Sequence, residues 1–145
     1  MKKFVVSVVL GMGMLLALAS PAAAKQGDTT YYVGAGDTKH SEVSFKLRDG
    51  RIREALIGAG QTTCAGNRKV SLWKSFVGIQ LDGNHFHRRS RHDLNDVFVF
   101  GGHVRGASAS GRMRITTGRQ CSSGVVRWAA DRVSRDDYQH FGHHR

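Results

Sequence analysis

The densest group of chemically capable side chains lies in residues 84–93, which read NHFHRRSRHD. If this stretch begins as extended chain, His85 and His87 point to the same side, and His92 with Asp93 could return across a loop. Imidazoles together with a carboxylate suit Zn²⁺ or Cu²⁺. The interleaved arginines oppose any bound cation, so we expect no cofactor and keep His85, His87 and His92 as the alternative metal site.

The same stretch also forms a basic patch. Its cations are Arg88, Arg89 and Arg91, and we expect Arg68 and Lys69 to join them. Guanidinium forks match phosphate and sulfate oxygens in bidentate geometry. The sequence therefore predicts an anion-binding site on these five residues.

Catalytic patterns are weak. Residues 122–124 read Ser-Ser-Gly, which is a turn and not the G-x-S-x-G elbow that carries the nucleophilic serine of α/β-hydrolases. Glycoside hydrolysis needs two carboxyls held across a cleft, and the nearest approach to such a pair is Asp93 with Asp96. We therefore predict a non-catalytic protein, with a hydrolytic or metal site on the loop from His85 to Asp96 as the alternative.

The N-terminal segment has the three parts of a secretory signal peptide. Lys2 and Lys3 precede an apolar run over residues 4–18, and Ala22-Ala23-Ala24 supplies small residues for cleavage. We predict a signal peptide over residues 1–24, a short leader over residues 25–28, and a mature protein without a transmembrane segment. The predicted location is extracellular, and association with the cell wall fits the charge described below.

Cys64 and Cys121 are the only cysteines. Two cysteines in an exported chain are expected to pair. A loop of this length gives about 4 kcal/mol in the chain-entropy model.

The charge balance is strongly basic. Removing Lys2 and Lys3 with the signal peptide lowers the net charge from +11 to +9, with histidines neutral. Such a surface attracts anionic polymers, glycans or lipid headgroups, although it also serves solubility alone. Trp73 and Phe86 could stack on bases, but no nucleic-acid motif is present and export argues against DNA, so specific nucleic-acid binding is not expected.

The elements that must position these residues are short strands. Val43, Phe45 and Leu47 alternate with polar residues before Asp49-Gly50, which is a strong hairpin signal. Residues 107–133 form a second alternating pair, the closing hairpin. Eight or nine strands at this spacing predict an all-β, antiparallel β-sandwich over residues 29–133, with a small closed β-barrel as the alternative.

Further expectations concern the core, the surface and the end of the chain. We predict that residues 58–66 form a glycine-rich connection and that the strand beginning at Phe86 ends after a few residues. Residues 134–145 are predicted to be a flexible tail carrying histidine and arginine. An outer stripe of arginines is interpreted as a solubility device: Arg112, Arg114 and Arg119, extended by Arg127 and Arg132. The predicted core is Val43, Phe45, Leu47, Ile52, Leu56, Phe98, Phe100, Met113, Ile115, Val126 and Trp128.

A scattered set of turn and core positions resembles a known group of proteins. These are Val43-Ser44-Phe45, Asp49-Gly50, Asp82-Gly83 before Phe86, the glycines of residues 106–111, and above all Cys121-Ser122-Ser123-Gly124 before Trp128. The pattern resembles small exported β-sandwich domains of actinobacteria, which have no assigned activity. The resemblance implies one disulfide and a tryptophan in the last strand. Together with the charge, it leads us to expect a secreted binding module whose basic face contacts an anionic extracellular or cell-wall ligand.

Overall fold

The computed structural model describes residues 27–92, 95–118 and 120–143. Its elements, in chain order, are β1 (Thr30–Gly36), β2 (Ser41–Arg48), β3 (Arg51–Thr63), the 3₁₀ turn η1 (Ala65–Asn67), β4 (Lys69–Gln80), β5 (His85–Arg91), β6 (Val97–Arg105), β7 (Ser108–Thr117), β8 (Cys121–Ser122), β9 (Val126–Val133) and α1 (Arg135–His143). The strands form one antiparallel sheet in the order β4-β3-β2-β1-β9-β7-β6-β5, with β8 paired to β7. The predicted all-β class is confirmed.

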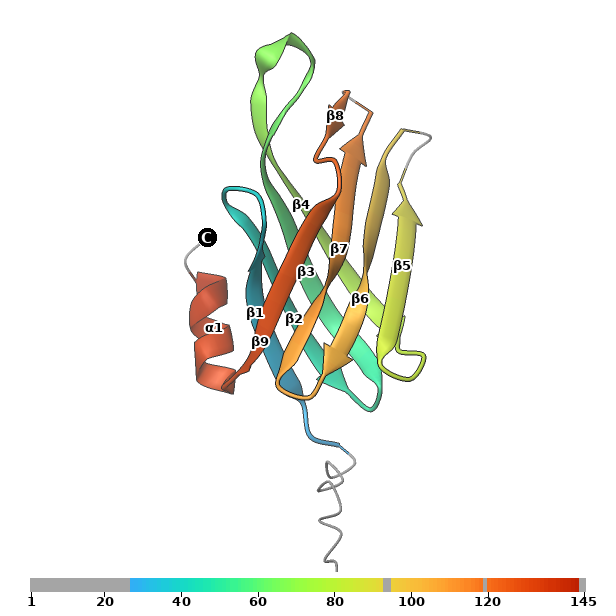
Figure 1. The fold of residues 1–145 in the computed structure, drawn as a ribbon, viewed down its shortest axis with the longest axis vertical. Coiled ribbons are helices and arrows are strands. Elements are labelled where there is room, and N and C mark those ends of the chain that lie inside the picture. Colours follow the sequence, from blue (N-terminus) through green and yellow to red (C-terminus); the bar gives the residue numbers. More distant parts are fainter. Residues whose placement is uncertain (1–26, 93–94, 119, 144–145) are drawn as a thin grey trace, which may run out of the picture.

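The sheet rolls up into an almost closed barrel. Figure 1 shows β9, β7, β6 and β5 crossing over the half of the sheet that contains β2, β3 and β4, with α1 outside β1. The arrangement corresponds to the barrel alternative, because neighbouring strands follow one another in a single hydrogen-bonded sheet. The edge strands β4 and β5 approach each other only near the turn that joins them. Gln80 ends β4 before this turn, and His85 begins β5 after it.

Two predicted hairpins are confirmed. Asp49 and Gly50 both have positive φ, at 53° and 66°, and turn β2 into β3 with Arg48 opposite Arg51. This conformation is the one that Asp-Gly favours in a two-residue hairpin loop. The predicted closing hairpin is the β7–β9 pair, in which Ala109 faces Ala130.

A β-bulge explains the one predicted core residue that lies on the wrong side of β3. Lys46 pairs with Glu54 and the next residue of β2 pairs with Ile52, so Arg53 is an extra residue in β3. The bulge breaks the two-residue alternation. Leu56 therefore turns partly outward, while its neighbours Ala55 and Ile57 are fully buried.

Two irregular segments expected from the sequence are strands. The predicted connection over residues 58–66 continues β3 as far as Thr63, because Gly60, at φ +74°, forms a second bulge instead of a loop. The strand that begins near Phe86 does not end early, because β5 stays paired with β6 as far as Arg91. The prediction for residues 58–66 was wrong because their glycines were interpreted as a turn. The prediction for the segment after Phe86 was wrong because its run of charges was interpreted as a loop.

Aromatic side chains fill the barrel. Phe45 is fully buried and stacks on Tyr32 with ring centroids 4.7 Å apart, and Phe100 lies 5.0 Å from Phe86 and 5.3 Å from Trp128. The prediction that Trp128 belongs to the core is confirmed, since only 3% of it is exposed. Of the other predicted core residues, Leu47 is partly buried and the remaining members apart from Leu56 are buried.

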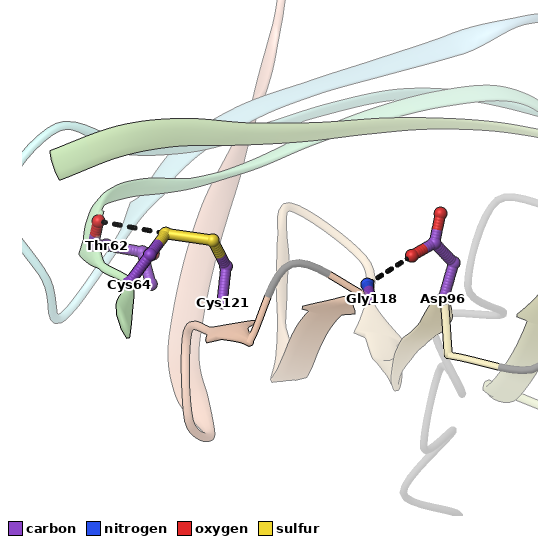
Figure 2. The surroundings of a disulfide bond; sticks show 5 residues. All are labelled: Thr62, Cys64, Asp96, Gly118 and Cys121. Carbon is purple, nitrogen blue, oxygen red and sulfur yellow. Dashed lines mark hydrogen bonds between the residues drawn. A yellow bond between two sulfur atoms is a disulfide. The ribbon is translucent and has the colours of Figure 1, made fainter. Parts of the chain in front are cut away.

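A disulfide joins Cys64 to Cys121, as predicted. Figure 2 shows that it connects the end of the β3 segment to the start of β8, which pairs with β7. The bond therefore links segments that are far apart in the strand order. Nearby, the Asp96 carboxylate accepts a 2.6 Å hydrogen bond from the Gly118 amide.

The C-terminal segment is helical where the sequence predicted a flexible tail over residues 134–145. Ser134 caps α1, since its hydroxyl accepts a hydrogen bond from the Asp137 amide at 3.1 Å and donates to the Asp137 carboxylate at 2.7 Å. Tyr138 then packs on Tyr31 of β1, with ring centroids 5.1 Å apart. The cap signal was present in Ser-Arg-Asp-Asp, but the absence of an apolar period concealed it.

Tyr32 provides a test of how the barrel end is held. Its hydroxyl donates a 2.7 Å hydrogen bond to the Gly106 carbonyl in the β6–β7 turn. Tyr32→Phe is expected to lower the free energy of unfolding by about 1 kcal/mol, measured by urea denaturation. Tyr31→Phe, on the same strand, is the control and should have a smaller effect.

The pH dependence of stability gives Tyr32 a second readout. Burial raises the pKa of Tyr32 above 10.0, outweighing the opposing effects of Thr30 and of the Arg132 charge. Above about pH 10 the unfolded chain therefore loses this proton before the folded protein does, and stability falls as the pH rises. Tyr32→Phe should make the alkaline decline less steep. An unchanged alkaline profile would contradict the assignment.

The predicted signal peptide, residues 1–24, lies outside the described residues. Among the residues that are described, no helix is long and apolar enough to span a membrane.

Candidate functional site

The outer face of β5, β6, β7 and β9 carries a broad basic groove. Strand pairing places its residues in cross-strand rows, while the residues between them point into the core. We call three of these rows the central row (His87, Gly101, Arg112 and Arg127), the histidine row (His85, His103, Ser110 and Ala129) and the arginine row (Arg89, Val99 and Arg114). The groove has a volume of about 1220 Å³.

Two arginines face each other in the central row. Arg112 on β7 and Arg127 on β9 are direct antiparallel neighbours, and both are exposed. No described carboxylate lies within ion-pairing distance of either side chain or of Arg114. Asp37 binds only the backbone of Arg127, where its carboxylate accepts from the amide at 3.0 Å. Directly opposed like charges destabilise a sheet, so this pair has a cost in the free protein.

Three histidines line the other side of the groove. His85 and His103 are opposite each other, with ring centroids 5.9 Å apart, and the Ser110 hydroxyl lies 3.2 Å from Nε2 of His103. His87 shares the outer face with His85, as the sequence predicted. That His103 joins them was not predictable, because it depends on the register between β5 and β6.

The rest of the groove is mixed in character. Val99 and Val125 contribute apolar surface, and 61% of Val125 is exposed. Asp82 is the one acidic residue among the described lining residues, and its backbone bonds to that of His85. The groove thus combines cations, which attract anions, with small apolar patches.

The predicted arginine patch is divided by the pleat of β5. Arg89 and Arg91 lie on the groove side, whereas Arg88 shares the other face with the buried Phe86. Arg88 is still exposed because β5 is an edge strand. The patch therefore contributes two of its three arginines to the groove face.

The other two predicted anion ligands lie elsewhere. Arg68 and Lys69 stand at the turn between η1 and β4. Figure 1 shows that this hairpin tip projects beyond the barrel, well apart from β5. Among the proposed stacking residues, Phe86 is 5% exposed and belongs to the core, while Trp73 is 39% exposed and packs against Gly58 on the outside of β4.

The predicted metal ligands are not brought together. His85 begins β5, and His92 follows its last residue, which separates them by roughly 20 Å of extended chain. No group of three or more histidines, cysteines or carboxylates that could hold a metal occurs among the described residues. Asp93 lies outside the described residues, and Asp96 is engaged with the Gly118 amide.

No protein-family model, no curated protein and no solved structure matches this chain. The resemblance to exported actinobacterial domains therefore stays a prediction. The candidate site depends on geometry and charge alone.

Proposed function

We propose that the protein is a secreted, non-catalytic binding module that contacts an anionic extracellular or cell-wall polymer through the basic groove. The observation that carries this proposal is the opposed pair Arg112 and Arg127, for which the described residues supply no carboxylate partner. A sheet that keeps two unpaired arginines opposite each other gains stability when an anion lies between them. The proposal moves the contact from the β5 arginines predicted first to the wider face that includes β7 and β9.

The packed interior supports an outer site. Phe45, Phe100 and Trp128 fill the barrel behind the groove, so the strands present their outer residues to a ligand. Metal binding as the main activity is disfavoured, because Arg112 and Arg127 lie in the same groove as the histidines and repel cations.

Binding to soluble polyanions tests the proposal. The mature protein, residues 25–145, is titrated with dextran sulfate and with polyphosphate over a range of salt concentrations. The double variant Arg112→Gln/Arg127→Gln is expected to bind at least about tenfold more weakly, since each charged hydrogen bond contributes about 1.5–3 kcal/mol. The matched control, Arg68→Gln/Lys69→Gln, removes the same charge at the β3–β4 tip and should lose no more than about threefold.

Stability provides an independent readout of the same variants. Relieving the repulsion between the two opposed arginines in Arg112→Gln/Arg127→Gln should stabilise the free protein by about 0.2–1 kcal/mol, although it weakens binding. Equal losses of affinity in the groove variant and the tip control would show diffuse attraction to net charge and would contradict the proposed site.

A further inference from the structure

The central row of the groove has a gap at Gly101. This glycine lies between His87 on β5 and Arg112 on β7, and both of these side chains point to the outer face. Adjacent strands lie about 4.8 Å apart, so the two flanking backbones are roughly 9.6 Å apart with no side chain between them. The missing side chain leaves this space to the His87 ring, which leans over Gly101, and to a small group beside that ring and the Arg112 guanidinium.

The imidazole of His87 borders this gap. A Cβ atom placed on Gly101 would lie 3.1 Å from Nδ1 of His87 and 3.2 Å from the Phe86 carbonyl oxygen. Any side chain at position 101 would thus compete with the His87 ring for the same space. Glycine at this position keeps the ring nitrogen accessible beside the groove floor.

The surrounding charges favour an anion in the gap. Arg114 and Arg89 belong to the neighbouring arginine row, and His85 and His103 belong to the histidine row on the other side. Arg127 stands behind Arg112, and Asp82 is the one described acidic residue that lines the groove. A tetrahedral oxyanion matches these donors, because a guanidinium fork and an imidazole can each donate to its oxygens.

We infer that Gly101 is the floor of a subsite for one phosphate or sulfate ester group, held between His87 and Arg112. This inference deepens the proposed function and rests on it: the polymer lies along the groove, and one of its ester groups enters the gap.

Small monoesters test the subsite separately from the polymer. Glucose 6-phosphate and glucose 6-sulfate are titrated into the mature protein at constant ionic strength, and the imidazole and arginine side-chain resonances are followed by NMR. We expect the largest shifts at His87 and Arg112. Saturation by either ester supports the subsite, and the tighter ester distinguishes a phosphorylated from a sulfated polymer. Shifts of the same size with acetate would reveal general attraction of anions and overturn the inference.

Two variants and a control complete the test. Gly101→Val fills the gap and should weaken monoester binding at least about tenfold, while polyanion binding falls by less than about threefold because the other arginines remain. Ser75→Val also introduces a valine at an exposed strand position, on β4 and outside the groove, and should change neither affinity. Because the valine also crowds the Phe86 carbonyl, His87→Gln is the second variant, and it should weaken monoester binding without added bulk.

The outcomes separate the two proposals. If the wild-type protein binds neither polyanion, the proposed function is wrong. If it binds polyanions and Gly101→Val and His87→Gln both keep wild-type affinity for the monoesters, only the subsite is wrong.

Discussion

Loss of the Cys64–Cys121 disulfide is expected to lower the free energy of unfolding by about 4 kcal/mol, because the bond closes a long loop in the unfolded chain. The cysteines are 57 residues apart in sequence. In the thermal transition of a domain of this size, such a loss corresponds to roughly 15 °C in Tm. Calorimetry of the double variant Cys64→Ala/Cys121→Ala against the oxidised protein measures it.

The position of the disulfide makes it more than an entropic constraint. The loop between its cysteines contains both edge strands, β4 and β5, and no ladder joins these edges in the described sheet. Cys64 and Cys121 themselves form an isolated β-bridge, so the covalent bond lies where the two halves of the barrel meet. A reducing agent should lower the Tm of the wild-type protein and leave that of the double variant unchanged. A Tm difference of only a few degrees would contradict this role.

Features governed by local chemistry were predictable from the sequence. Asp49-Gly50 specifies its turn by backbone preference, and the two cysteines of the sequence have only each other as partners. Trp128 was predictable as core because it alternates with other buried positions of β9. Each of these inferences needs only neighbouring residues or simple counting.

Features that depend on register were not predictable. The bulge at Arg53 reverses which side chains of β3 face inward, and nothing in the local pattern marks it. The arginines of β7 and β9 were recognised as an outer stripe, but their direct opposition follows from the register in which β7 pairs with β9. Arg132 leaves that stripe because it is out of phase with Arg127, and Arg119 lies outside the described residues. The groove could therefore not be predicted without the registers that pair β5, β6, β7 and β9.

The second large effect is expected in the core. Phe45 is fully buried and contacts Tyr32, Phe86, Phe100 and Trp128 from the centre of the aromatic cluster. Phe45→Ala removes these contacts and leaves a cavity, so the free energy of unfolding should fall by about 3–5 kcal/mol. Phe45→Leu keeps most of the volume and should cost about 1–2 kcal/mol. Urea denaturation of both variants measures the difference.

The same variants decide which side of the sheet binds the ligand. Phe100 and Trp128 lie beneath the groove, whereas Arg112 and Arg127 stand on its outer surface, so a loosened interior leaves the charged rows in place. Folded Phe45→Leu, and Phe45→Ala below its unfolding transition, should therefore bind polyanions within about threefold of the wild-type affinity. If binding falls in proportion to the volume removed while the protein stays folded, the ligand enters the barrel. An outer-face site requires that stability and affinity change independently.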